Sequence, residues 1–134
     1  MMFLLDTNVW VTYLRGKSSL VKQQIEVKAP HEIALCSVVL GELFYGVLRS
    51  QNAMKNRSAV ETLVTPYVCL PFDDAAADRY AAIRYDLETA GASIGPYDLQ
   101  IAAIALVHNC TVVTHNKAEF GRIPDLLIED WETS

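Results

Sequence analysis

The chain has 134 residues, which favours a single domain over residues 1–134, because domains typically contain about 100–150 residues. A hydrophobic fraction of 51% excludes a wholly disordered protein, and no apolar run approaches the roughly 20 residues that a membrane helix needs. The net charge of −5 excludes a uniformly basic nucleic-acid-binding surface, although residues 15–61 carry seven Lys and Arg against four Asp and Glu.

Short apolar runs alternate with helical patterns along the chain. In chain order we expect a strand at 2–5, helices at 8–14 and 20–27, a strand at 33–36, helices at 37–49 and 52–64, a strand at 68–70, helices at 74–89 and 97–108, and strands at 111–114 and 126–128. Ser37 and either Asp73 or Asp74 are the expected caps of their helices. Uniformly apolar strands between helices predict an α/β fold, namely a three-layer α/β/α sandwich around a mostly parallel sheet.

The cysteines and the first residues of the chain indicate the cellular compartment of the protein. Cys36, Cys69 and Cys110 lie far apart, each beside an apolar run, without C-x-x-C spacing. We therefore expect them to be buried, reduced thiols. The first apolar run ends at Asp6, too soon for a secretory signal, and this predicts a soluble cytoplasmic protein.

Three acids occupy positions where a carboxylate needs an explanation. Asp6 follows the first strand, at the edge where parallel sheets bind ligands, although it also suits a helix N-cap. Glu42 is the only acid in a strongly apolar helix, so it pairs with Arg49, faces solvent or belongs to a site. Asp98 opens the most apolar helix, whose dipole also stabilises an anion.

Convergence of these acids would create a cation site. Carboxylates at one pocket repel one another, so one becomes protonated unless a cation neutralises them. Mg²⁺ prefers such all-oxygen ligand sets, and metals of this kind catalyse phosphodiester hydrolysis. The chain lacks phosphate-loop, dinucleotide, nucleophile-elbow and H-E-x-x-H motifs. His115, beside a strand end, is a further candidate for contact with a substrate.

Five segments, in this order, resemble the PIN-domain ribonucleases, and among them the VapC toxins of bacterial toxin–antitoxin pairs. They are Leu4–Asn8, Ser37–Leu43, Ile94–Asp98 with the following Ile101-Ala102, Thr114–Phe120 and Glu129–Trp131. The resemblance covers essentially the whole chain. It implies a PIN-like sandwich, an endoribonuclease dependent on Mg²⁺ or Mn²⁺, a homodimer, and a small VapB-like antitoxin that holds the enzyme inactive.

The resemblance also implies roles for individual residues. By matching position, Asp6, Glu42 and Asp98 are the acidic residues of the metal site. Supporting roles at this site fall to Thr7, Asn8 and Ser37. Many family members carry a fourth acid where this chain has Asn116, whose amide keeps a carbonyl oxygen but no charge. Glu119 either contributes in its place or acts only as a capping residue.

The expected substrate is RNA. The segment Gly95–Asp98 is similar to VapC toxins that cut the anticodon loop of initiator tRNA. Arg15, Lys17 and Arg49 are candidates for contacts with backbone phosphates, since their charge offsets the repulsion between an acidic site and RNA.

Two other classes of function remain open at this point. The first is a catalytically silent domain of the same shape that binds RNA or a protein partner, an alternative that Asn116 favours. The second is a phospho-acceptor receiver domain, which also places an acid after its first strand. A receiver domain needs an acid pair there and a lysine late in the sheet, whereas Thr7 and Asn8 follow Asp6, and Lys117 is poorly placed.

Overall fold

Five short parallel strands form the centre of the computed structural model, which describes residues 1–133. They are β1 (Phe3–Leu5), β2 (Ile33–Cys36), β3 (Val68–Leu70), β4 (Thr111–Val113) and β5 (Ile128–Glu129), in the order β3-β2-β1-β4-β5. All four neighbouring pairs are parallel. The predicted five-stranded parallel sheet is therefore confirmed.

Only β5 is displaced from its expected position, 126–128. Leu127 is exposed although it is apolar, so its side chain is not a sign of a buried strand at this position. Its carbonyl accepts a hydrogen bond from the Val112 N–H at 2.9 Å, and the strand proper begins at the next residue.

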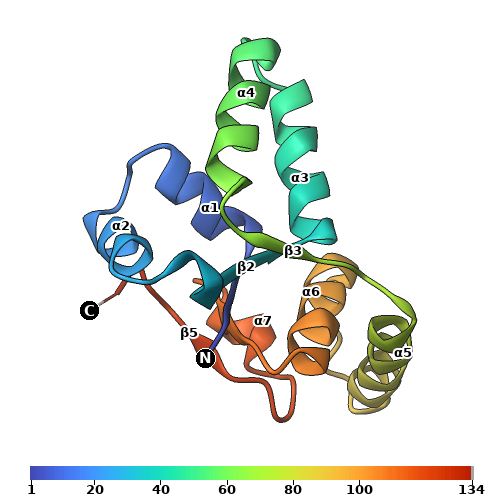
Figure 1. Cartoon of the computed structure of the whole chain (residues 1–134). Coiled ribbons are helices and arrows are strands. Elements are labelled where there is room, and N and C mark those ends of the chain that lie inside the picture. The colour runs from blue at the N-terminus through green and yellow to red at the C-terminus, as the bar shows by residue number, and fades with distance from the viewer. Residues whose placement is uncertain (134) are drawn as a thin grey trace.

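Helices cover the sheet on both sides, as the sandwich prediction requires (Figure 1). They are α1 (Thr7–Leu14), α2 (Ser19–Glu26), the 3₁₀ helix η1 (Pro30–Glu32), α3 (Ser37–Leu48), α4 (Ala53–Val64), α5 (Asp74–Thr89), α6 (Pro96–Val107) and α7 (Lys117–Phe120). The six predicted helices form within a residue of their expected ends. The sequence pattern missed η1 and α7, because three or four residues are too few to show a helical period.

Burial explains why the strands are apolar throughout. Leu4 and Leu5 of the central strand β1 are completely buried, as are Val112 and Val113 of β4. Figure 1 shows α1 and α2 on one side of the sheet and α5 and α6 on the other. Because helices cover both faces, a polar side chain in the central strands would be buried and would cost free energy unless it formed a hydrogen bond.

The predicted caps are right for α5 and wrong for α3. Asp73 caps α5 by accepting the Ala76 N–H at 3.0 Å. Ser37 does not cap α3, because β2 runs directly into this helix and Cys36 takes the N-cap position. The Ser37 hydroxyl instead donates to the Leu70 carbonyl at 3.3 Å and accepts the Phe72 N–H at 3.2 Å, which ties the end of β3 to the start of α3.

The prediction of buried thiols holds for two of the three cysteines. Cys36 and Cys110 are buried, but Cys69 is exposed. Cys69 lies on β3, an edge strand with a neighbour on one side only, and Val68 beside it is exposed as well. All three cysteines are free thiols.

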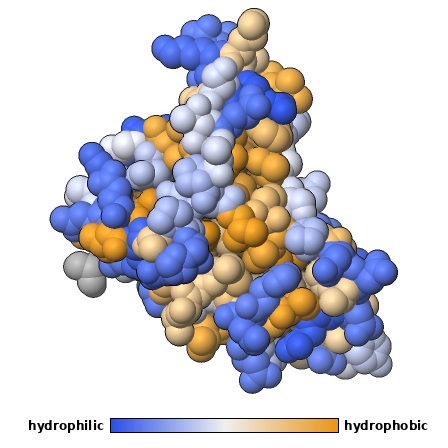
Figure 2. Space-filling view, viewed as in Figure 1, coloured by the Kyte–Doolittle hydropathy of each residue, from blue (hydrophilic) through white to orange (hydrophobic). Residues whose placement is uncertain are grey.

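Helices α3 and α4 pack against each other and extend beyond the sheet as an arm, residues 37–64 (Figure 1). Exposed apolar side chains on the arm are Tyr45, Leu48 and Met54. On the face shown in Figure 2, apolar residues gather at the centre of the molecule, whereas α5 is mainly hydrophilic. No helix in residues 1–133 combines the length and apolar character needed to cross a membrane.

Candidate functional site

Asp6 is a helix cap and part of an acidic site at the same time. It directly follows β1, and its Oδ1 accepts the Val9 N–H at 3.1 Å, which caps α1. Its Oδ2 accepts a hydrogen bond from the Thr114 hydroxyl at 2.6 Å. Only 7% of Asp6 is exposed, so these two bonds fix the direction of a buried carboxylate at the carboxyl end of the central strand.

Glu42 approaches this edge of the sheet from α3. The Thr7 hydroxyl donates to Glu42 Oε1 at 2.7 Å, so the residue after Asp6 holds the second acid of the site. Glu42 is half-buried, and in residues 1–133 it makes no ion pair with Arg49. Of the three alternatives for Glu42, an ion pair with Arg49 is therefore wrong, and membership of a site stays a prediction.

Asn116 links the remaining acids. Its side-chain Nδ2 donates to Asp98 Oδ2 at 3.3 Å and to Glu119 Oε2 at 3.2 Å, while its backbone N–H donates to the Thr114 hydroxyl at 2.9 Å. A continuous chain of hydrogen bonds thus runs from Asp6 through Thr114 and Asn116 to Asp98 and Glu119. The sequence pattern did not single out Thr114, because an apolar strand with a terminal threonine carries no sign of its partner.

The acids influence one another electrostatically. Burial, the hydrogen bond with Glu119 and the negative charges of Glu119, Asp6 and Glu42 together raise the pKa of Asp98 to about 7, and burial has the largest effect. Burial also raises the pKa of Asp6, against the lowering effect of the bonds from Thr114 and Val9. These shifts show that the carboxylates share one region of low solvation and unbalanced negative charge.

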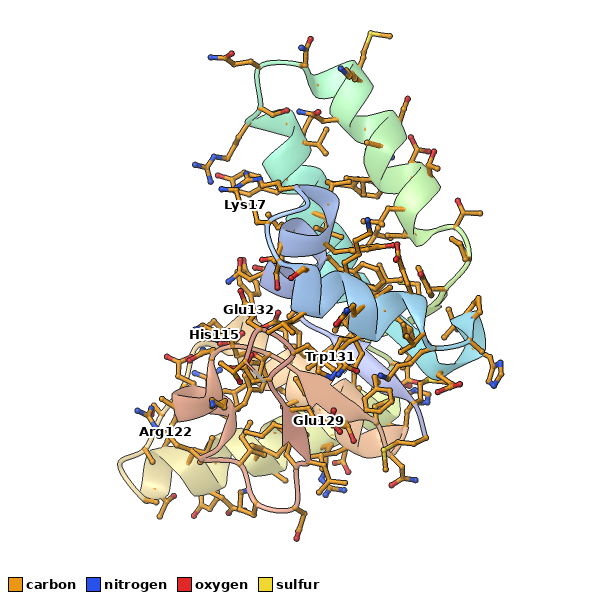
Figure 3. The ribbon with its side chains drawn as sticks, turned by 90° about the vertical axis from the view of Figure 1, so that its left-hand side faces the viewer. Lys17, His115, Arg122, Glu129, Trp131 and Glu132 are labelled. Atoms are coloured by element: carbon orange, nitrogen blue, oxygen red, sulfur yellow. The ribbon has the colours of Figure 1, made fainter. Side chains whose placement is uncertain are left out.

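The other residues proposed for the site lie at varied positions. Asn8 is exposed. Ser37 bonds to the end of β3 rather than to the carboxylates, although it lines a groove that includes Glu42. Arg15 and Arg49 line two separate hollows, each of which also includes Glu42. Lys17 is exposed beyond α1, and Figure 3 shows it on the same side of the molecule as His115.

A second group of polar residues, which the sequence pattern did not predict, lies beside the first. His115 Nδ1 is 2.9 Å from Asp130 Oδ2 and 3.5 Å from Glu132 Oε2. In residues 1–133 these three form the only group of three or more His, Cys, Asp or Glu residues whose ligand atoms all lie within 4.8 Å of one another. The negative charge of Glu132 also raises the pKa of Asp6, so this C-terminal group adjoins the acidic site. The run of acids at 129–132 was the only sequence signal for it.

Lys117 belongs to this C-terminal group as well. Its Nζ lies 3.7 Å from Asp130 Oδ2 and therefore balances that carboxylate. A receiver domain needs its late lysine beside the acid that follows the first strand, and Lys117 is paired elsewhere. The receiver-domain alternative is therefore wrong.

Trp131 anchors the segment that carries Asp130 and Glu132. Its side chain is 3% exposed, and its ring centroid lies 5.3 Å from that of Phe3 in β1. Lys28 Nζ lies 4.5 Å from the centroid of Trp131, and the indole Nε1 donates to Glu129 Oε1 at 3.0 Å. Trp131, His115 and Glu132 are labelled on the same face of the molecule in Figure 3.

The donor set of Asp6, Glu42 and Asp98 fits a hard divalent cation. All three supply carboxylate oxygens, the ligands that Mg²⁺ prefers. In the described part of the chain, no Lys or Arg nitrogen lies within 4 Å of these carboxylates, so their charge is left for another cation to balance. The chain of hydrogen bonds through Thr7, Thr114 and Asn116 holds them on one edge of the sheet.

The pKa of Asp98 predicts how stability depends on pH without metal. Between about pH 4, near the pKa of an unfolded Asp, and about pH 7, folded Asp98 keeps a proton that the unfolded chain has released. The unfolded state then binds fewer protons, so the free energy of unfolding falls as pH rises through this range. In EDTA we expect the urea midpoint to be lower at pH 7.5 than at pH 5.5, and the difference to shrink in Asp98→Asn. An equal difference in both proteins would contradict the assignment.

Comparison with known proteins identifies the family of this chain. Residues 3–126 match the PIN domain family. The chain is 35% identical over 133 residues to Ribonuclease VapC2 of Rickettsia felis, covering 98% of this chain and 99% of that relative. It is 34% identical over 129 residues to the tRNA(fMet)-specific endonuclease VapC of Shigella flexneri, covering 96% and 97% respectively.

Solved structures show the same relationship. The fold matches VapBC2 of Rickettsia felis bound to a promoter DNA fragment with a TM-score of 0.91 at 35% identity, over 98% of this chain and 99% of the other. It matches DNA-bound VapBC of Salmonella typhimurium with a TM-score of 0.92 at 34% identity, over 98% of both chains. A PIN-like sheet, an acidic edge and relatives matched over nearly their whole length lead to one conclusion: this chain belongs to the PIN-domain family and groups within it with the VapC ribonucleases.

Proposed function

We propose that this protein is a metal-dependent endoribonuclease and the toxin of a toxin–antitoxin pair. The observation that carries the proposal is the set of carboxylates from β1, α3 and α6 at one edge of the sheet, unbalanced by any described Lys or Arg. The ribonuclease names of the relatives support the same activity. Residues 1–134 act as a single domain in this proposal.

Asp6, Glu42 and Asp98 would hold Mg²⁺, with Mn²⁺ as a substitute. When bound, the ion lowers the pKa of the attacking water and balances the negative charge of the scissile phosphate. The protein contributes orientation: Thr114 and the Val9 N–H direct Asp6, and Thr7 directs Glu42. Water would attack the phosphorus in line with the leaving 3′ oxygen and release a proton to solvent, while the 3′ oxygen would take up a proton as its bond to phosphorus breaks. The expected products therefore carry a 5′-phosphate and a 3′-hydroxyl.

Asn116 and Glu119 complete this site in the proposal. The Asn116 amide donates to both Asp98 and Glu119, so one side chain binds two carboxylates that lie close together. Asn116 keeps its carbonyl oxygen free of these two bonds, and that oxygen is available to a cation or to water. We assign Glu119 to the site rather than to capping, because its charge acts on Asp98.

The proposed substrate is tRNA, with the anticodon loop of initiator tRNA as the first target to test. The relative from Shigella flexneri is named a tRNA(fMet)-specific endonuclease. Arg15, Lys17 and Arg49 are the proposed contacts for backbone phosphates.

A small VapB-like antitoxin is the proposed partner, since the related structures are VapBC complexes. A homodimer acting in the cytoplasm, where tRNA is found, completes the proposal.

Cleavage by antitoxin-free protein tests this function. Purified protein is incubated with initiator and elongator tRNA in Mg²⁺, Mn²⁺ or EDTA, and the 5′ ends of the products are sequenced. We expect cleavage with either metal, none in EDTA, and one dominant cut in initiator tRNA. A protein that neither cuts any tRNA nor binds Mg²⁺ or Mn²⁺ in a calorimetric titration would instead be the catalytically silent binding domain that the neutral Asn116 favours.

A further inference from the structure

We propose that the groove between α3 and α6 is a subsite for the bases of single-stranded RNA, in which Tyr45 and Tyr97 are stacking platforms. This inference rests on the proposed function, because the groove opens from the acidic site. It assigns a binding role to two exposed tyrosines beside the carboxylates.

The groove is large enough for more than one base and is continuous with the acidic site. It encloses about 720 Å³, and its lining includes Thr7, Glu42, Tyr45 and Arg49 on one side and Tyr97 and Gln100 on the other. Glu42 and Thr7, joined by a 2.7 Å hydrogen bond, belong to the groove and to the acidic site alike. Tyr97 immediately precedes Asp98 in the chain. A strand that lies in this groove therefore leads directly to the carboxylates.

The two tyrosines are exposed, and the Arg49 guanidinium lies over one face of the Tyr45 ring. Tyr45 is 61% exposed and Tyr97 is 59% exposed. In residues 1–133 the aromatic pairs are Phe3 with Trp131, Trp10 with Tyr67 and Phe72 with Tyr80, so neither groove tyrosine has a ring partner. Bases of single-stranded nucleic acid stack on such rings with little dependence on sequence.

Two side chains of the groove, Arg49 and Gln100, favour RNA over an apolar protein segment. The Arg49 guanidinium lies 5.4 Å from the Tyr45 ring centroid, so a base on Tyr45 would place its phosphate within reach of a cation. Gln100 supplies an amide that can donate to and accept from base edges. Bases in a duplex cannot present their faces to a side chain, so the proposal commits to a single strand.

Binding without cleavage separates this inference from the catalytic proposal. A short, 3′-labelled single-stranded RNA of mixed sequence is titrated in EDTA and followed by fluorescence anisotropy. We expect Tyr45→Ala and Tyr97→Ala each to raise Kd about tenfold, and Tyr45→Phe and Tyr97→Phe to stay within about twofold, because phenylalanine keeps the ring. The matched control is Tyr85→Ala on α5, whose side chain is 72% exposed and outside the groove, and it should leave Kd unchanged.

Two further probes sharpen the test. The same RNA with abasic sites should bind the unmodified protein about as weakly as the alanine variants, and an RNA duplex should bind all variants alike. Unchanged Kd values in Tyr45→Ala and Tyr97→Ala, or an equal loss in Tyr85→Ala, would overturn the inference. So would dissociation of a dimer by Tyr45→Ala in size-exclusion chromatography, since the groove would then be an interface between copies. Cleavage in Mg²⁺, measured separately, decides the proposed function.

Discussion

Replacing Asp98 by asparagine is expected to lower the rate of RNA cleavage by about 10²-fold or more, the loss typical when one electrostatic group of an active site is removed. Asparagine has almost the same shape and keeps one oxygen, but it lacks the negative charge that a divalent cation requires. The fold should remain intact, because Asp98 is one of several acids that repel one another. At pH 7.5 in EDTA the variant should unfold at a urea concentration equal to or above that of the unmodified protein.

The matched control is Asp74→Asn. Asp74 also lies in the first turn of a helix, α5, but it is exposed, and no hydrogen bond or ion pair in residues 1–133 joins its side chain to Asp6, Glu42 or Asp98. Loss of one negative charge there should leave cleavage unchanged. Cleavage by Asp98→Asn at the rate of the unmodified protein, in the same Mg²⁺ concentration, would remove Asp98 from the proposed metal site. An inactive but stable Asp98→Asn, with an active Asp74→Asn, would place the effect at the site rather than in the fold.

Replacing Trp131 by alanine is expected to reduce the free energy of unfolding by about 3 kcal/mol, at the lower end of the range for a large buried aromatic residue. The substitution removes the ring that packs on Phe3 and beneath Lys28. It should also loosen Asp130 and Glu132 on either side, and with them the contacts to His115. Urea unfolding, followed by far-UV circular dichroism, measures the change.

Two variants serve as controls for Trp131→Ala. Trp131→Phe keeps most of the apolar surface and loses only the bond to Glu129, so it should cost about 1 kcal/mol. Tyr85→Ala removes an exposed ring and should stay within about 0.5 kcal/mol of the unmodified protein. If Trp131→Ala unfolds at the same urea concentration as Tyr85→Ala, the C-terminal segment contributes nothing to stability and its anchoring role is wrong.

Local sequence patterns predict the elements of this fold well, because the central strands are buried on both faces. The run Phe3–Leu5 and the helix that follows Asp73 depend only on neighbouring residues, so composition and capping are enough to find them. Short elements such as α7 escape the pattern. Cys69 was misjudged because its apolar neighbours cannot show that β3 lies at the edge of the sheet.

The site was only partly predictable, because its bonds join residues that are far apart in the chain. Asp6 stood out by its place after a strand, but its partner Thr114 is 108 positions away. Nothing near His115 indicates that it meets Asp130 and Glu132. Asn116 was noticed as an amide in place of an acid, whereas its actual bonds, to Asp98 and Glu119 together, emerged only from the packing of α6 against α7.

The order of the strands bears on when activity arises during synthesis. The central strand β1 precedes its neighbour β4 by about a hundred residues, so it is made well before β4 and the Thr114 and Asn116 that follow β4. A growing polypeptide therefore carries Asp6 without the hydroxyl that orients it, and Asp98 without the amide that binds it. If the proposed function is right, a prematurely terminated product that lacks β4 is expected to be inactive.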